Sequence, residues 1–323
     1  MAILGVTSQK GRLFCPGDPA TDLRLHLAQA LELAPKTAPI VIMIHGYKYH
    51  PGHPNSNPHK LLFSHSNTQS TKLTSWPLGL GFEKMTTKDG LAIGFAWEGR
   101  PRRDIRPKPM LSSFAHVYKQ ANRAGGHLAR ILKWIHVLAP DRPVDLIAHS
   151  LGARVAFSGL SRLSTRNVDR VILMGGAEYA SSLDRYFRHI DQNSDLEVFN
   201  ITTRQNSFVD FLFECFAPRS NPSDFAIGKG YVGPTSNWIN LNLDDTATLN
   251  MLATRGIGIS RARKLKLVDH WGFYARAGVL RFYQQLLRHR ASWRMEDLRQ
   301  ELIWAQLPDN QDPLSIKPFS PLT

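Results

Sequence analysis

The sequence places a serine where an apolar run meets a helix-like stretch. The run 144–148 precedes Ser150, "ARVAFSGL" follows it, and Ala148 and Gly152 stand two residues to either side. A hydroxyl on so sharp a strand-to-helix turn needs small residues at these two positions, because larger side chains would collide across the bend. This small-x-Ser-x-small pattern, in this context, is typical of a nucleophilic serine. We therefore predict that Ser150 is a nucleophile.

A serine hydroxyl is a poor nucleophile unless a base lies within hydrogen-bond reach, and that base needs a third group to hold its tautomer. His270, in "KLVDHWGFY", lies between an extended stretch and the last apolar helix-like segment. His289 also comes late in the chain, but it falls within a basic helical end and is better explained as a surface residue. We predict that His270 is the base.

The acid that orients the histidine is harder to place. The strand-like segment 196–204 is followed by Asn206 and Ser207, which are polar but not carboxylates, and Asp210 is the nearest aspartate. An asparagine can orient a histidine, although it stabilises an imidazolium less well. We predict Asp210, and we keep Glu178, which follows the preceding strand-like segment, as the alternative.

Acyl transfer also needs hydrogen-bond donors aimed at the developing oxyanion. One is expected to be the backbone N–H of the residue after the nucleophile, Leu151. The second is expected in the loop after the early apolar run 40–44, which ends in His-Gly and makes Tyr47 the donor. The residues expected to support these two turns are His45, Gly46, His149 and Gly152.

Alternating strand-like and helix-like segments must position these groups. Uninterrupted apolar blocks such as 40–44 predict strands buried on both faces of a parallel sheet. Apolar residues at steps of three and four over 117–138 predict a long helix with one apolar stripe. The pattern indicates an α/β fold with a mainly parallel sheet flanked by helices.

We expect one domain over 1–323 with two long insertions and a C-terminal extension. The insertions, 47–90 and 216–268, do not follow the strand–helix pattern and are expected to be lids or substrate loops; the extension covers 292–323. Because the first insertion follows the predicted oxyanion loop, Trp76 and Phe82 are expected to line an acyl pocket.

These segments together resemble the α/β-hydrolase superfamily, in its esterase/lipase-like branch. The resemblance runs from about residue 38 to 288 and rests on "IVIMIHGY", "DLIAHSLGARVAF", "VILMGGAEY", "RQNSFVDFLFE" and "VDHWGFY". It implies a mainly parallel sheet flanked by helices, a Ser-His-acid triad and no metal or organic cofactor. The chain departs from the family pattern at Ala148, where glycine is usual, and at Asn206-Ser207, where the acid is usual.

The chain is strongly basic, with 40 Lys+Arg against 26 Asp+Glu and a net charge of +14. Basic clusters at 99–109, 261–266 and 288–294 could attract anions, but aromatic residues do not alternate with them, so we do not expect a nucleic-acid partner. Five histidines between 45 and 65 lack nearby cysteine or carboxylate, so we expect no metal site. The sequence contains neither a membrane-span pattern nor a secretory signal pattern, so we expect a cytoplasmic location.

The sequence therefore predicts a serine hydrolase that cleaves a small-molecule or lipid-like ester or thioester through an acyl-enzyme. An amide or polyester substrate fits the same residues. The competing hypothesis is a protein with the same fold but no catalytic activity, whose basic face binds an anionic partner. Acyl length, leaving group and oligomeric state are not specified by these patterns.

Overall fold

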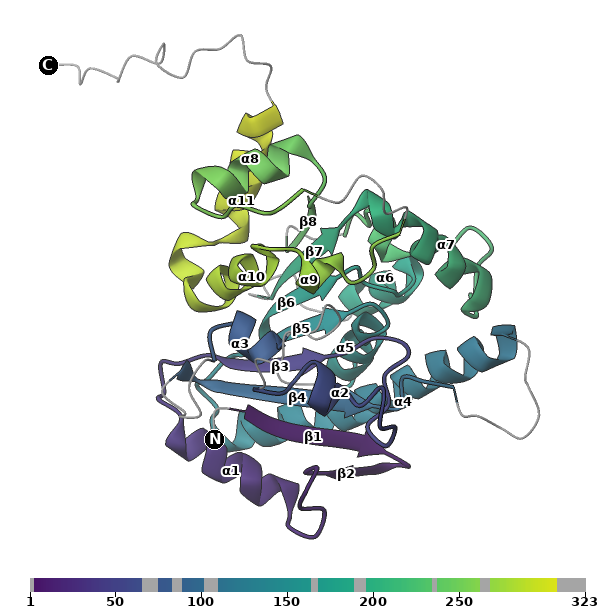
Figure 1. The fold of residues 1–323 in the computed structure, drawn as a ribbon, viewed down its shortest axis with the longest axis vertical. Coiled ribbons are helices and arrows are strands. Elements are labelled where there is room, and N and C mark those ends of the chain that lie inside the picture. The colour runs from purple at the N-terminus through teal and green to yellow at the C-terminus, as the bar shows by residue number, and fades with distance from the viewer. Residues whose placement is uncertain are drawn as a thin grey trace, which may run out of the picture.

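A computed structural model describes residues 3–65, 75–82, 89–101, 110–163, 168–188, 196–233, 237–261 and 268–306. Its centre is an eight-stranded sheet in the order β2-β1-β4-β3-β5-β6-β7-β8 (Figure 1). β2 pairs antiparallel with β1, and every other neighbouring pair is parallel. The strands are β1 (Ile3–Gln9), β2 (Arg12–Phe14), β3 (Ile40–Ile44), β4 (Leu91–Trp97), β5 (Val144–His149), β6 (Val168–Met174), β7 (Glu197–Thr202) and β8 (Trp238–Asn242).

Helices cover both faces of this sheet, as the uninterrupted apolar strands predict. Along β3, Ile40, Ile42 and Ile44 belong to one core cluster, while Val41 and Met43 belong to a second one. Successive side chains of a strand point to opposite faces, so both faces of β3 are buried. The predicted α/β fold with a mainly parallel sheet flanked by helices is confirmed.

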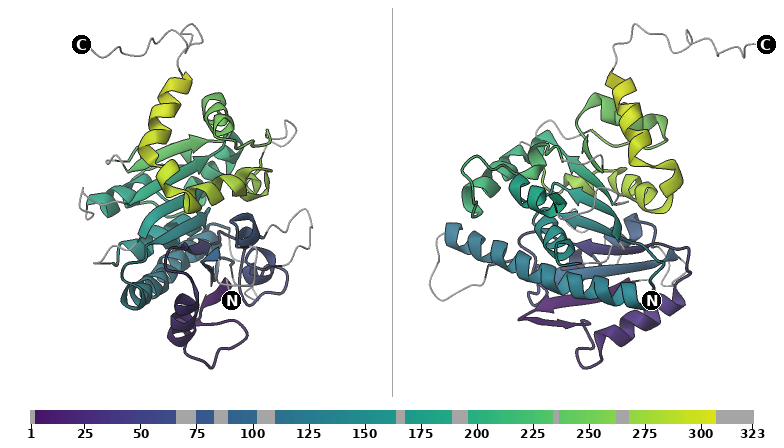
Figure 2. Two further views of the ribbon diagram at one scale, coloured as in Figure 1. Left: turned by 90° about the vertical axis from the view of Figure 1, so that its left-hand side faces the viewer. Right: turned by 180° about the vertical axis from the view of Figure 1, so that it is seen from behind.

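The first core cluster packs under one set of helices, and the second packs under another. The first set is α1 (Leu23–Leu33), α4 (Met110–Leu138), α5 (Gly152–Leu160), α6 (Ala180–Arg188) and α7 (Ser207–Phe216). The second set is α3 (Trp76–Gly79), α8 (Thr246–Thr254), α9 (Gly272–Ala275), α10 (Val279–Arg288) and α11 (Met295–Gln306). The short α2 (Pro58–Leu61) precedes α3. Figure 2 shows α4, the helix predicted over 117–138, running across the strands when the molecule is seen from behind.

The two intervals predicted as insertions contain regular elements. The interval 47–90 holds α2 and α3, and the interval 216–268 holds β8 and α8. β8 pairs with β7 in parallel and forms one edge of the sheet. The second interval therefore contributes a strand to the sheet, in addition to its loops. A lid role for either interval stays a prediction.

The topology gathers several segments at one edge of the sheet. The carboxyl ends of parallel strands meet at a common edge, which is where open α/β sheets bind ligands. The predicted oxyanion loop follows β3, the serine turn follows β5, and the Asn206–Asp210 segment follows β7. Residues more than 150 positions apart in sequence are thereby brought to the same edge.

Candidate active site at the carboxyl edge of the sheet

Ser150 occupies the turn between β5 and α5 with a left-handed backbone. Its φ is +53°, a conformation that is unfavourable for a residue with a side chain and costs on the order of 1 kcal/mol. The Ser150 N–H donates to Met174 O at 3.0 Å, and its carbonyl accepts from Ala153 N at 3.0 Å and Ala177 N at 2.9 Å. Bonds to the following helix and to the end of β6 thus hold the strained turn.

Two glycines let the end of β3 approach this turn backbone to backbone. A Cβ on Gly152 would lie 2.7 Å from Ile44 O and 2.9 Å from His45 O. A Cβ on Gly46 would lie 2.7 Å from Ser150 Cβ. Neither contact is compatible with a side chain. The predicted need for small residues around the serine therefore has a physical basis beyond the bend itself: the loop after β3 fits directly against the turn.

His270 reaches its polar partner across 64 residues, and that partner is Asn206. The His270 Nδ1 lies 2.7 Å from Asn206 Oδ1, and Asn206 Nδ2 donates to Asp210 Oδ1 at 2.9 Å. Because the Asn206 amide donates to Asp210, its oxygen is the group that faces His270, and His270 Nδ1–H is the donor. This tautomer leaves His270 Nε2 as an acceptor. The order of contacts is His270, Asn206, Asp210.

The two carboxylates considered from the sequence have different positions in this arrangement. Asp210 is buried and contacts Asn206, so its charge reaches His270 through an amide. Glu178 accepts from Tyr118 Oη at 2.6 Å and from Arg154 Nη1 at 2.7 Å. These bonds use both carboxylate oxygens of Glu178, and neither of them is to His270. Asn206, a buried amide four residues after β7, is the partner of His270 that the prediction of a carboxylate missed.

The environment of the chain His270–Asn206–Asp210 shifts the pKa values at both ends. Burial, followed by the neighbouring His149 and Lys48, lowers the pKa of His270 well below its usual value. The imidazole is therefore neutral, as a base must be. Burial raises the pKa of Asp210 to about 7, against the hydrogen bond from Asn206, which lowers it. Asp210 thus changes charge near neutral pH.

His149 joins the serine turn to the histidine loop. Its Nε2 lies 3.0 Å from the carbonyl oxygen of His270, and the two ring centroids are 4.5 Å apart. Because a carbonyl can only accept, His149 Nε2 carries the proton. Burial lowers the pKa of His149 to about 4, which keeps it neutral. The residue before Ser150 therefore positions the backbone of the loop that carries His270.

The predicted oxyanion loop is held by a second buried histidine. Trp97 N donates to His45 Nε2 at 3.0 Å, and Trp97 Nε1 donates to the His45 carbonyl at 2.8 Å. His45 Nδ1 donates to Gly46 O at 2.9 Å, and burial lowers the pKa of His45 to about 3. This neutral histidine ties the end of β3 to the end of β4. Its role is to fix the loop that carries Tyr47.

The two predicted oxyanion donors lie on either side of the contact between loop and turn. Among the backbone hydrogen bonds between described residues, none has the N–H of Tyr47 or of Leu151 as its donor. Leu151 follows Ser150 and is buried, and the Tyr47 ring packs 5.1 Å from that of Phe114. Nor does a hydrogen bond of the described residues join Ser150 Oγ to His270. The use of these groups in catalysis therefore belongs to the proposal below.

Trp76 and Phe82 lie in the second core cluster with fully buried side chains. The Trp76 ring lies 5.2 Å from Tyr274 and 6.4 Å from His149, so it packs behind the site. The guanidinium of Arg288 lies 4.6 Å from the centre of the Phe82 ring. This packing stabilises the core beside the site. The expected role of the two residues in lining an acyl pocket stays a prediction.

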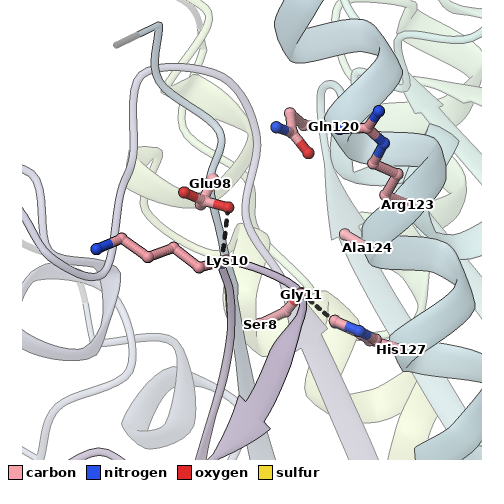
Figure 3. A pocket seen from close by; sticks show the side chains of 8 residues that line it. All are labelled: Ser8, Lys10, Gly11, Glu98, Gln120, Arg123, Ala124 and His127. Atoms are coloured by element: carbon pink, nitrogen blue, oxygen red, sulfur yellow. Dashed lines mark hydrogen bonds between the residues drawn. The ribbon is translucent and has the colours of Figure 1, made fainter. Parts of the chain in front are cut away.

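A separate hollow of about 400 Å³ opens near the turn between β1 and β2 (Figure 3). Its polar walls combine Lys10, Glu98, Gln120, Arg123 and His127. There the Ser8 hydroxyl lies 2.8 Å from His127 Nδ1, and the Lys10 N–H donates to Glu98 at 3.0 Å. These polar groups bond to one another, and Ser150 and His270 are not among the lining residues.

The described part of the chain, residues 3–306 with its gaps, contains neither a cluster of metal ligands nor a membrane-spanning helix. No group of three or more His, Cys, Asp or Glu in these ranges could hold a metal ion. Within the histidine-rich segment, His59 Nε2 contacts Thr7 Oγ1 at 2.9 Å, which is a structural bond. None of the helices in these ranges has the length and apolarity to cross a bilayer. The basic stretches 102–109 and 262–267 lie outside the described residues.

Comparisons with known proteins give only distant similarities. Residues 110–214 match the model of a family described as a protein of unknown function, DUF726. No curated protein matches the chain. Similar solved structures include a lipase-esterase related protein from Clostridium acetobutylicum ATCC 824, at 10% identity and a TM-score of 0.31 over 70% of this chain and 94% of that one. An alpha-beta serine hydrolase homologue from Coxiella burnetii has 12% identity and a TM-score of 0.33 over 80% and 86% of the two chains. The phospholipase PlaB from Legionella pneumophila has 12% identity and a TM-score of 0.33 over 83% and 63%.

Proposed function

We propose that the protein is a serine hydrolase that cleaves carboxylic esters or thioesters through an acyl-enzyme. The observation that carries the proposal is the combination of a left-handed Ser150 after β5 with a His270 whose Nδ1 is engaged by Asn206. The fold itself requires neither a strained turn at a residue other than glycine nor an imidazole whose tautomer is fixed. Here both features occur at the same edge of the sheet. Strain of this kind persists where the surrounding structure enforces it, and it clusters at functional sites.

In the proposed mechanism, Ser150 Oγ attacks the substrate carbonyl while His270 Nε2 takes its proton. Asn206 holds Nδ1–H throughout, and the carboxylate of Asp210 polarises the Asn206 amide toward the imidazolium. The N–H groups of Tyr47 and Leu151 donate to the oxyanion. His270 then protonates the leaving group, and a water deprotonated by the same nitrogen releases the acid.

The test is covalent labelling combined with turnover. A fluorophosphonate probe should label the wild type, and Ser150→Ala should abolish labelling and lower p-nitrophenyl ester turnover by about 10⁴-fold or more. Esters of graded acyl length then report the pocket, since a short-chain optimum indicates a cramped site. Labelling that survives Ser150→Ala would contradict the proposal. Absence of both labelling and turnover in a folded wild type would favour the non-catalytic binding protein.

A further inference from the structure

Helix α7 presents an uncharged aromatic face to solvent directly beside the candidate site. Phe208 and Phe211 are each 54% exposed, and Cys215 is also exposed. Their spacing of three and four residues puts them on one side of the helix. The opposite side is the packed one, since Phe213 is buried with its ring 6.2 Å from Phe114 of α4. Figure 1 shows α7 at the margin of the molecule, beside the N-terminal end of α4.

The two carboxylates of α7 do not contribute charge to this face. Asp210 is buried against Asn206. Glu214 accepts from Lys229 Nζ at 2.6 Å and from Ala226 N at 2.9 Å. A face of phenylalanines therefore remains without an acidic group turned toward it. Isolated exposed apolar residues need no explanation, but a helical face of them does.

A second exposed aromatic comes from the loop that carries the candidate base. Trp271 directly follows His270 and is 53% exposed. The same loop is fixed to the start of α7, because Asp269 N donates to Gln205 O at 3.4 Å and His270 bonds Asn206. Trp271 and the exposed face of α7 therefore lie on either side of the contact between the His270 loop and the start of α7. We name Phe208, Phe211, Cys215 and Trp271 the aromatic rim.

Three exposed cations flank the residues of the aromatic rim. Arg204 and Arg219 are exposed and stand four residues before Phe208 and four after Cys215. Lys48 is exposed and close enough to His270 to lower its pKa. Within the described residues, no ion pair involves any of these three side chains. The whole chain carries a net charge of +14.

We propose that the aromatic rim docks on the surface of an anionic lipid bilayer. Phenylalanine and tryptophan side chains insert at the boundary between headgroups and acyl chains, and surrounding arginines and lysines add attraction to anionic headgroups. The occupant is a lipid surface because the rim combines solvent-exposed aromatics with unpaired cations. Docking would place the candidate site against the bilayer. On that basis, and resting on the proposed function, the substrate is an ester presented by the membrane.

The test measures sedimentation with vesicles, using the full-length Ser150→Ala protein so that docking is read without turnover. Binding to vesicles of phosphatidylcholine with phosphatidylglycerol should exceed binding to phosphatidylcholine alone by at least about tenfold, and ~0.5 M salt should abolish most of the excess. Phe208→Ser/Phe211→Ser should lower the partition coefficient about tenfold or more. Leu25→Ser/Val137→Ser, two exposed apolar residues on α1 and α4, is the matched control and should bind like the parent.

Cys215 supplies a local readout. Cys15 is buried, with its pKa raised to about 11 by burial and by Asp18, so a thiol-reactive fluorophore will label Cys215 selectively. Its emission should shift to the blue on adding anionic vesicles. Equal binding by the Phe208→Ser/Phe211→Ser protein, or equal loss in the control variant, would overturn the proposal. So would a wild-type dimer that this variant dissociates, because the rim would then be a self-interface. These outcomes are independent of ester turnover, which tests the proposed function separately.

Discussion

At the scale of single residues, the contact of His270 with Asn206 rather than with a carboxylate decides how the base is supported. An amide orients the imidazole when its oxygen faces the ring, as here, but it brings no charge of its own. Here the charge is supplied one bond further out, by Asp210. In the proposed mechanism, two residues share tasks that one aspartate usually performs: Asn206 fixes the tautomer, and Asp210 provides the electrostatic stabilisation.

This separation predicts unequal effects of two substitutions. Asn206→Leu removes the acceptor of His270 Nδ1–H and should lower kcat by about 10³-fold. Asp210→Asn keeps an oxygen for the Asn206 amide and should cost only about tenfold, because the charge acts through an intervening group. Steady-state kinetics on a p-nitrophenyl ester measure both. A loss of about 10⁴-fold in Asp210→Asn would instead mean that Asp210 contacts the histidine during catalysis.

The pH profile of Asp210→Asn is the control for this prediction. Asp210 is neutral below its pKa of about 7 and negative above it. Because the negative form stabilises the imidazolium, log kcat/KM of the wild type should rise through pH 7. The rise should be absent in Asp210→Asn, while a separate step at lower pH, from His270, should remain. A step near pH 7 that persists in the variant would assign it to another group.

At the scale of elements, the backbone at the end of β3 packs directly against the backbone of the turn after β5, with no side chain between them. Gly152→Ala would place a methyl 2.7 Å from Ile44 O, which belongs to a buried strand and cannot move freely. We expect a loss of about 1–3 kcal/mol in the free energy of unfolding and, under the proposed mechanism, a lower kcat, since the loop after β3 is displaced. Urea unfolding and turnover measure the two effects.

Gly126 offers a matched control for that substitution. It lies within α4, and a Cβ there would meet only Arg162 Nε, at 3.9 Å. Gly126→Ala should therefore stabilise the protein by roughly 0.5–1 kcal/mol, as alanine does in a helix, and leave kcat unchanged. If Gly152→Ala behaved like Gly126→Ala, the close approach of β3 and the serine turn would not constrain the site.

The elements that the sequence predicts are those buried on both faces. β3 and β4 are fully buried, and their uninterrupted apolar runs indicate strands directly. β1, β2 and β8 lie toward the sheet edges, where "ILGVTSQ", "RLF" and "WINLN" mix polar with apolar residues. An edge strand needs only part of its surface to be apolar, so its pattern is weak. For that reason β8 fell within an interval predicted as a loop.

The sequence predicts those parts of the candidate site that depend only on residues close together along the chain. The turn at Ser150 is specified by nearby sequence: the small residues Ala148 and Gly152, the apolar run before them and the helix-like stretch after them identify it together. The partner of His270 is a long-range contact, and three candidates, Asn206, Asp210 and Glu178, are compatible with the chain order. Asn206 and Asp210 are one helical turn apart at the start of α7, and tertiary packing alone decides which of them faces the histidine.

At the scale of the whole molecule, part of the basic charge is structural rather than a surface for partners. The sequence suggests that the basic cluster 288–294 could attract anions, but Arg288 packs over Phe82. Arg290 donates to Asp145 at 2.5 and 2.6 Å and to Asp169 at 2.9 Å. These two aspartates belong to β5 and β6. Arg290 therefore joins the C-terminal segment to the edge of the sheet opposite the candidate site.

This junction predicts a pH-dependent loss of stability. Asp145 is completely buried, and Arg290→Ala would leave it without its bidentate partner, at a cost of about 3 kcal/mol. Burial raises the pKa of Asp145 to about 7 even with Arg290 present. A group with a raised folded-state pKa binds its proton more tightly in the native state, so its contribution to stability is lost as the pH rises from about 4 through 7. Without Arg290 that pKa rises further, because the opposing positive charge is gone.

The destabilisation by Arg290→Ala should therefore be small at pH 5, where Asp145 can take up a proton, and clearly larger at pH 8, where the carboxyl is charged in the parent. Urea unfolding at the two pH values measures it. Asp169→Asn removes the half-exposed partner and should cost less than about 0.5 kcal/mol at either pH. Equal losses for Arg290→Ala at both pH values would mean that the buried carboxylate does not govern the effect. The C-terminal segment would then be held by its apolar contacts, chiefly those of Trp293 and Leu298 in the second core cluster.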